Sequence, residues 1–286
     1  MTVRRTHTLF TAAVAGALGL LAFGVGARAE ITGSVKLNGK APESKELDMS
    51  GVKECKDQHA DPVYEESVVV GEKGDLANVI VALKPDDPGA LGGEVPSDPA
   101  VLDQKGCQYF PHVIAMMVGQ KMMVKNDDPF IHNVHSLAQQ NPAFNVQQPN
   151  KDAGKEVESP KTKETFKVKC EVHPWMGAWV AVFDHPFFAV SGEDGKFTIK
   201  GNPPDGEYPV VAWHEKYGSK EGKVTVKDGK GTVDFTFDAG SAKADEPANA
   251  NVKLASELKA ASGESTMSCC EMPAAKTAVA AETPAK

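Results

Sequence analysis

The chain has 286 residues, with 31 basic and 39 acidic side chains and a formal net charge of −8. Its only arginines, Arg4, Arg5 and Arg28, lie within the first 29 residues, which contain no acidic residue, so the rest of the chain has a net charge of −11. Nucleic-acid binding needs a basic surface, and guanidinium is the favoured group for bidentate phosphate contacts. Nucleic acid is therefore excluded as a partner.

Residues 1–29 are typical of a secretory signal peptide. Arg4 and Arg5 precede an apolar run over residues 9–25, and Ala27-Arg28-Ala29 fits the small-residue cleavage motif. The run is short and rich in glycine for a signal anchor, which is the alternative. The paired arginines lack the hydrophobic pair that follows them in twin-arginine signals. We therefore expect ordinary secretion, cleavage after Ala29, and a periplasmic or secreted protein.

Beyond residue 29 the sequence predicts an all-β protein. Short runs rich in Val and Ile, bounded by Gly, Pro and Asp, predict strands at 31–37, 63–70, 78–83, 113–118, 121–125, 165–169 and 178–183. Gly119-Gln120 suits a tight turn and predicts a hairpin between two of these strands. Residues 85–99 and 141–163 are expected to be surface connections, the second with a short strand near 144–146. Many short strands with regular turns predict a β-sandwich.

Three metal-binding side chains recur within one loop, between the strands expected at 165–169 and 178–183. Cys170, His173 and Met176 supply a thiolate, an imidazole and a thioether. A blue-copper site takes two His, one Cys and a weak axial Met, so one imidazole is missing. His132 and His135 are the candidates, and because they are three residues apart on a strand, only one can point inward.

The residues His132-Asn133-Val134, taken with Cys-x2-His-x2-Met, resemble the copper-binding pattern of the cupredoxin (type 1 blue copper) family. The short loop, with Pro after the His and an aromatic residue before the Met, is most similar to that of the amicyanins and plastocyanins. The resemblance is strongest over residues 112–184. It implies a Greek-key β-sandwich that binds one copper ion through His132, Cys170, His173 and Met176, with Asn133 linking the two ligand-bearing segments.

The resemblance implies an electron carrier rather than an enzyme. Such a protein would pass single electrons to and from a protein redox partner, such as a cytochrome or a dehydrogenase, and would have no small-molecule substrate. Pro174 and Trp175 would then project near the surface, where electrons enter and leave. The His-x-His pairs of multicopper oxidases, the second loop cysteine of dinuclear copper centres and the haem-binding Cys-x-x-Cys-His motif do not occur. A copper-binding or copper-delivery protein, and a structural interaction module without redox turnover, stay open as alternatives.

Two further cysteines, Cys55 and Cys107, are candidates for a disulfide because the chain is expected to be exported. Cys55-x3-His59 and Cys107-x4-His112 are instead compatible with metal ligation. We favour the disulfide, since pairing is the usual fate of cysteines in secreted proteins.

The sequence predicts a division into four parts. Residues 1–29 form the signal peptide and residues 30–186 the copper-binding sandwich. Residues 187–238, with turns at 191–195 and 203–206 and strands at 196–200, 208–214, 223–227 and 232–237, resemble a carboxypeptidase regulatory-like β-module. With about fifty residues, this second sandwich is expected to pack on the first. Residues 239–286 are rich in Ala, Lys and Glu, lack aromatic residues, include the adjacent Cys269 and Cys270, and are expected to be disordered.

Overall fold

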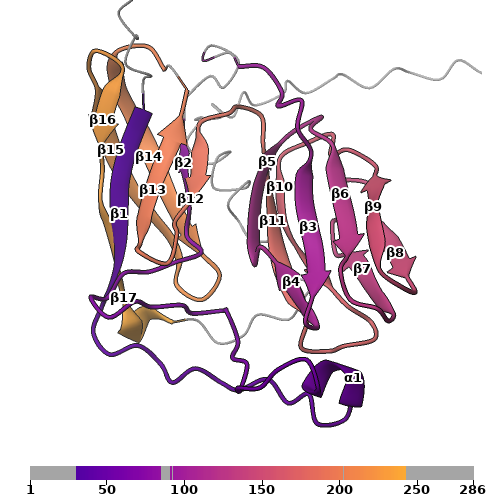
Figure 1. The fold of residues 1–286 in the computed structure, drawn as a ribbon. Helices are drawn as coiled ribbons and strands as arrows, with labels where there is room; N and C mark the ends of the chain where they lie inside the picture. The colour runs from indigo at the N-terminus through magenta and orange to yellow at the C-terminus, as the bar shows by residue number, and fades with distance from the viewer. Residues whose placement is uncertain (1–29, 85–90, 92, 202, 243–286) are drawn as a thin grey trace, which may run out of the picture.

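The computed structural model describes residues 30–84, 91, 93–201 and 203–242, and within these ranges the protein is all-β, as predicted (Figure 1). The expected signal peptide, most of the expected disordered tail and the Cys269-Cys270 pair lie outside the described residues. Among the helices in the described ranges, none is long and apolar enough to cross a membrane.

Four β-sheets make up the described part of the protein. The first sheet consists of β13 (Lys196–Lys200), β1 (Glu30–Asn38) and β16 (Lys230–Thr232), with β17 (Phe235–Asp238) also paired to β1. The second consists of β12 (Phe188–Val190), β2 (Ile80–Leu83), β14 (Gly206–His214) and β15 (Gly218–Val226). The third consists of β5 (Val113–Met117), β11 (Gly177–Phe183), β10 (Glu164–Lys169), β7 (His132–Ser136) and β8 (Asn145–Gln148).

The fourth sheet consists of β4 (Gln108–Phe110), β3 (Ala100–Lys105), β6 (Met122–Asn126) and β9 (Asp152–Val157). The helical elements of the described chain are one turn of α-helix, α1 (Lys53–Lys56), and a 3₁₀ turn, η2 (Ala239–Ser241). The 3₁₀ turn continues the ordered chain a few residues into the segment expected to be disordered.

The four sheets pack in layers with an apolar core between each neighbouring pair. The first and second sheets enclose one core, to which Ile31, Val81 and Phe237 contribute. The third and fourth enclose another, which contains the candidate ligands Cys170 and Met176. A smaller core, which includes Trp179 and Trp213, lies between the second and third sheets and joins the two sandwiches face to face.

Strands β2 and β11 are buried on both faces because they form the two middle layers. In β11, Ala178, Val180 and Val182 face the core around the candidate ligands, whereas Trp179, Ala181 and Phe183 face the joint between the sandwiches. This alternation follows from the two-residue period of a strand. Because both faces of β2 and β11 are buried, the sequences of these two strands are continuous apolar runs rather than alternating ones.

The division between the two sandwiches differs from the expected one. Strand β1 pairs with β13, β16 and β17, and β2 pairs with β12 and β14. Both N-terminal strands therefore belong to the sandwich of the first and second sheets, together with the strands of residues 187–238; this is called the second sandwich because most of it comes later in the sequence. The expectation that residues 30–186 form one unit is therefore wrong at its N-terminal end. About fifty residues cannot bury enough apolar surface alone, and the second sandwich gains its core by recruiting β1 and β2.

Two local predictions are also wrong. Residues 63–70 form isolated bridges at Tyr64 and Val70 instead of a strand. Strands β5 and β6 do not form a hairpin, because β5 pairs with β11 in the third sheet and β6 pairs with β3 and β9 in the fourth. The turn at Gly119 carries the chain from one sheet of the sandwich to the other, and β9 lies in a stretch predicted to be a connection.

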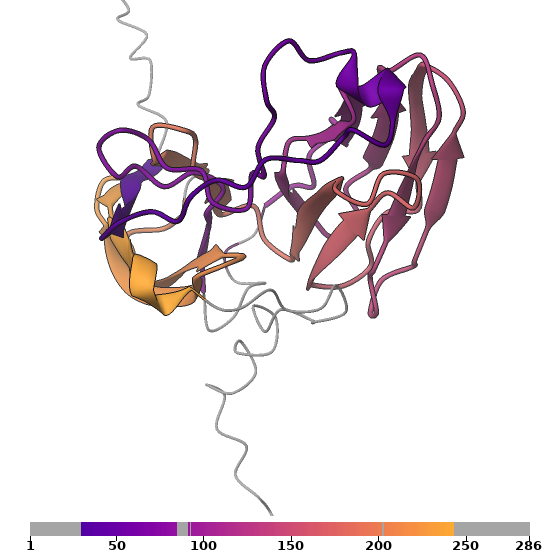
Figure 2. The same ribbon diagram turned by 90° about the horizontal axis from the view of Figure 1, so that it is seen from below.

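Residues 39–66, here called the crossing segment, run from the sandwich of the first and second sheets to the end of the other sandwich where the candidate ligands lie (Figure 2). The segment folds back on itself through an antiparallel bridge between Glu46 and Tyr64 and carries α1. Cys55, in α1, is joined by a disulfide to Cys107, between β3 and β4. A covalent bond thus ties this otherwise irregular segment to the sandwich that holds the candidate ligands.

Candidate metal centre

The hairpin of β10 and β11 presents three of the candidate ligands. Its loop is closed by hydrogen bonds from the Met176 amide to the His173 carbonyl, 3.0 Å, and from the Cys170 amide to the Met176 carbonyl, 3.2 Å. Cys170, His173 and Met176 are buried, whereas the intervening Glu171, Val172 and Pro174 are exposed. The three-residue spacing therefore turns every potential ligand of the loop inward.

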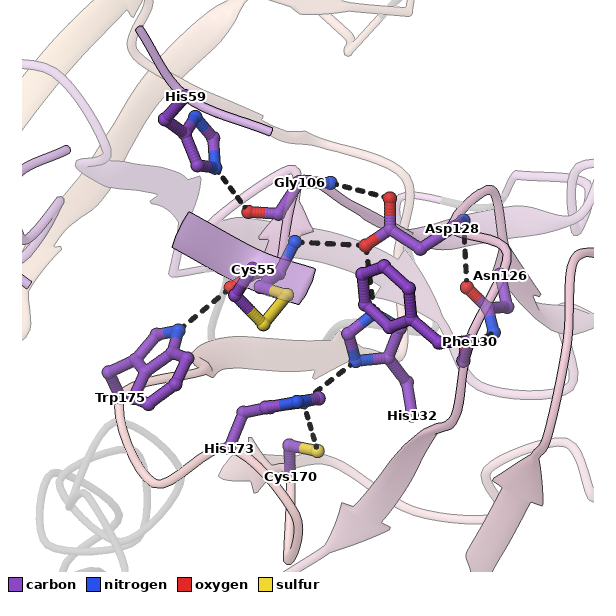
Figure 3. Close-up of a disulfide and its surroundings, with 11 residues drawn as sticks. Cys55, His59, Gly106, Asn126, Asp128, Phe130, His132, Cys170, His173 and Trp175 are labelled. Atoms are coloured by element: carbon purple, nitrogen blue, oxygen red, sulfur yellow. Dashed lines mark hydrogen bonds and ion pairs between the residues drawn. A yellow bond between two sulfur atoms is a disulfide. The ribbon is translucent and has the colours of Figure 1, made fainter. Parts of the chain in front are cut away.

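The second imidazole comes from β7, which pairs with β10. His132 is fully buried and its Nδ1 lies 2.9 Å from Nδ1 of His173. The same His173 nitrogen lies 3.7 Å from Sγ of Cys170 (Figure 3). One nitrogen of each ring and the sulfur all lie within 4.8 Å of one another. Met176 lies in the same core as Cys170, and its backbone closes the loop.

His135 does not join this cluster. Its side chain is partly exposed, and its Nδ1 lies 2.5 Å from a carboxylate oxygen of Glu171. The opposite orientations of His132 and His135 agree with the alternation of side chains along a strand.

The cluster strongly perturbs the ionisation of its thiol. Burial favours the neutral form of Cys170, but hydrogen bonds from His132 and His173 and from backbone amides outweigh it and lower the pKa of the thiol to about 5. For His132, burial acts against the charge, yet Asp128 and Cys170 together raise its pKa. At neutral pH the site therefore holds a thiolate, the form that binds metals.

Asp128 orients the His132 ring from outside the cluster. Its Oδ2 lies 2.8 Å from Nε2 of His132, and its carboxylate accepts hydrogen bonds from the backbone amides of Gly106, 2.8 Å, and Cys107, 2.9 Å. In the neutral form of the His132 ring, with Nε2–H donated to Asp128, the lone pair of Nδ1 points toward the cluster and is available to a metal. Such a contact fixes the tautomer of a metal-binding histidine. Asp128 was not evident from the sequence, because Asp127-Asp128-Pro129 reads only as a turn.

Asn133 connects the two ligand-bearing segments, as the resemblance implied. Its Oδ1 accepts a hydrogen bond of 2.6 Å from the amide of Glu171, next to Cys170. The backbone carbonyl of Asn133 accepts a hydrogen bond from the hydroxyl of Tyr109, a buried residue of β4. Burial and the neighbouring Cys170 together raise the pKa of Tyr109, so its hydroxyl stays protonated as a donor. The position of Tyr109 was not evident from the sequence.

The Cys55–Cys107 disulfide covers the edge of the cluster at His173. Both sulfurs lie within 4.8 Å of a ring nitrogen of His173, and both cysteines are fully buried. Trp175 packs against the His173 ring, with centroids 5.4 Å apart, and its Nε1 donates a 3.0 Å hydrogen bond to the carbonyl of Cys107 (Figure 3).

Pro174 is exposed and Trp175 is half-buried, so both lie near the surface as predicted, but His173 itself is only 2% exposed. The alternative roles of His59 and His112 as ligands beside these cysteines are not seen. His59 contacts the carbonyl of Gly106 at 2.7 Å, and His112 forms an ion pair with Glu215.

Comparison with known proteins gives partial similarities to copper proteins. No family model and no curated protein matches the chain. Among solved structures, a Cu-containing nitrite reductase from Thermus scotoductus is 21% identical, covers 35% of this chain and 27% of its own, and has a TM-score of 0.26.

An oxidised amicyanin mutant is 19% identical, covering 36% of this chain and 98% of its own, with a TM-score of 0.26. A purple cupredoxin from Nitrosopumilus maritimus is 22% identical, covering 29% and 99%, with a TM-score of 0.24. These similarities concern about a third of the chain and its fold alone.

The residues present fit a copper ion by their donor chemistry. Two imidazole nitrogens and an ionised thiol converge in a buried site that contains no carboxylate among its three closest donors. Hard cations such as Mg²⁺ and Ca²⁺ require oxygen ligands, whereas a His₂Cys set with a weak thioether is the ligand set of blue-copper centres.

Proposed function

We propose that the protein is an exported type 1 copper protein that carries single electrons. His132, Cys170 and His173 would hold the ion, and Met176 would supply a weak thioether ligand. A bound copper ion would supply a one-electron couple at this site. The observation that carries the proposal is the convergence of both Nδ1 atoms and the ionised sulfur in one buried cluster.

The protein's own residues would keep the site constant during electron exchange. Asp128 holds the His132 ring, Asn133 ties the two ligand-bearing segments, and the disulfide closes the His173 edge to water. A rigid, dry site needs little rearrangement when its charge changes, which favours fast electron transfer. Burial behind a covalent cap also favours a carrier over a delivery protein, because delivery requires an exchangeable metal.

Export is proposed from the signal-like residues 1–29 and is supported by the disulfide, since such bonds persist in oxidising compartments. A protein partner would be steered by the charge of −11 that remains after cleavage, which favours a partner with a basic docking face.

The test is to add Cu(II) to the metal-free chain and to follow the visible thiolate-to-copper band. One equivalent should produce an intense band that disappears with a reductant and returns with an oxidant. Cys170→Ser should abolish the band, whereas His135→Ala, on the same strand but outside the cluster, should retain it. A band that a chelator rapidly removes would favour a copper-delivery protein. If the parent chain shows no band, the carrier function is refuted and the alternative of a structural interaction module is favoured.

The role of Met176 as a weak ligand has its own test. Met176→Leu should still bind copper, and its reduction potential should rise, because the thioether that stabilises Cu(II) is gone. Cyclic voltammetry measures this shift. An unchanged potential and spectrum would show that Met176 only fills the core.

A further inference from the structure

A cavity of about 250 Å³ lies against the wall of the ligand-bearing loop. Its lining includes Trp175 and Met176 from the loop, Glu66 from the crossing segment, and Glu215 from the turn between β14 and β15. It therefore forms where the crossing segment and both sandwiches meet, directly beside the candidate metal centre. Nothing in the proposed carrier function so far uses it.

The cavity contains an internal ion pair. His112 and Glu215 bond through Nε2 and a carboxylate oxygen, and each side chain is only 10% exposed. Burial favours a neutral His112 ring, but the hydrogen bond and charge of Glu215 outweigh it and raise the pKa of His112. The pair thus remains charged while its two charges compensate each other.

Two further charged groups in the cavity have no ion-pair partner in the described part of the chain. Lys167 lies over the Trp179 ring, with Nζ 5.9 Å from its centroid, and has no carboxylate within 4.0 Å. Glu66 has no cation at that distance either, and burial raises its pKa, which makes its carboxylate a better proton acceptor. Such unpaired groups converging in a concave site mark it as a candidate binding site.

These groups select the chemistry of a ligand. A cation is disfavoured by the unpaired Lys167 and an anion by the unpaired Glu66, whereas a neutral hydroxyl can accept a hydrogen bond from the ammonium and donate one to the carboxylate. The aromatic rings of Tyr64, Trp175 and Trp179 also line the cavity, and aromatic side chains favour contact with another ring. A volume of about 250 Å³ suits a molecule with a single ring.

The cavity is also coupled to the candidate ligands by aromatic side chains. Trp175 packs on His173, and Tyr109, which also lines the cavity, bonds to the backbone of Asn133 beside Cys170. A ring bound here would contact Trp175 and Tyr109, each of which touches a ligand-bearing segment. The disulfide covers the His173 edge, so the cavity offers an approach to the site from the Met176 side.

We propose that this cavity binds a small uncharged phenol of the hydroquinone or catechol class, which donates electrons to the metal centre. The electron step rests on the proposed carrier function. In each step an O–H bond of the phenol breaks, its proton passes to the carboxylate of Glu66, and one electron would pass to a copper ion held by His132, Cys170 and His173. The second step, which completes the conversion of a hydroquinone to a quinone, follows after the redox partner has taken the first electron and Glu66 has released the first proton to solvent. This role differs from the expectation that the protein has no small-molecule substrate.

Binding is tested first without metal. The affinity of hydroquinone for the metal-free full chain is measured by calorimetry, together with Glu66→Gln, Lys167→Met and the control Glu221→Gln, an exposed carboxylate of β15 that pairs with Lys84. Losing a hydrogen bond to a charged group should weaken binding about tenfold in each cavity variant and leave the control unchanged. No saturable binding, or equal binding by all four proteins, overturns the proposal. Glu66→Gln is nearly isosteric, and thermal melts verify the fold of each variant.

The electron step is tested in the copper-loaded chain by the bleaching of its visible band. Hydroquinone should reduce Glu66→Gln and Lys167→Met about tenfold more slowly than the parent, while hexaammineruthenium(II), which needs no cavity, should reduce all of them equally. Equal slowing with both reductants overturns the role of the cavity. If the chain binds hydroquinone but shows no visible thiolate-to-copper band with Cu(II), the binding site is supported and the carrier function is refuted. Failure of the binding proposal and failure of the carrier function therefore give different results.

Discussion

Removing the disulfide should destabilise the protein and open the metal centre together. Cys55 and Cys107 are 52 residues apart in the sequence, and their sulfurs lie beside His173. Closing a loop of this length removes about 14 cal/mol/K of entropy from the denatured chain, which corresponds to about 4 kcal/mol at 25 °C. Cys55→Ala/Cys107→Ala should therefore lower the free energy of unfolding by about this amount.

Urea denaturation followed by tryptophan fluorescence measures the loss, with Cys269→Ser and Cys270→Ser present in both proteins so that no other thiol pair contributes. The second measurement is the rate at which a chelator removes copper. It should increase, because the crossing segment is then no longer tied over His173. A loss below about 1 kcal/mol would show that the disulfide does not restrict the denatured chain as this loop-entropy argument assumes. An unchanged extraction rate would refute the capping role.

Three further predictions concern single residues. Asn133→Ala leaves the amide of Glu171 without its acceptor and should cost about 1–3 kcal/mol in urea denaturation; no loss would contradict the linking role. In the metal-free protein the ultraviolet thiolate band of Cys170 should titrate at about pH 5, below the ordinary value of 9.0. Since this pKa is lowered, the stabilisation from the thiolate is complete above pH 9.0 and is lost as the pH falls to about 5; a midpoint near 9 would refute the assignment. Gly33→Ala would place a Cβ 1.8 Å from the carbonyl oxygen of Val233 and should cost about 3 kcal/mol without changing the copper band, which calorimetry and absorbance check.

The sequence was informative where the chemistry is local. Cys170, His173 and Met176 share one short loop, so their common inward orientation depends only on a three-residue spacing and on the closed hairpin. The alternation of a strand likewise separates His132 from His135 without any knowledge of the rest of the fold. The all-β class follows from the same short-range patterns.

Other features depend on which distant segments pair, and local patterns carry no such information. Strand β1 reads as an ordinary strand, but its pairing with β13 and β17 joins residues more than 160 positions apart. The turn at Gly119 is compatible with a hairpin and with a change of sheet, and only the packing of β5 against β11 selects the second.

For the candidate metal centre, the sequence by itself showed that Cys170, His173 and Met176 share one loop, and the family resemblance implied His132 as the fourth donor and the tie through Asn133. Only the tertiary structure decided that Asp128 orients His132, that a disulfide covers His173, and that a cavity forms beside Met176. The physical reason is that donor chemistry belongs to the residues themselves. The orientation of His132, the disulfide over His173 and the cavity beside Met176 depend on segments that are remote in the sequence. Burial of apolar surface brings these segments together, and their contacts exist only in the folded chain.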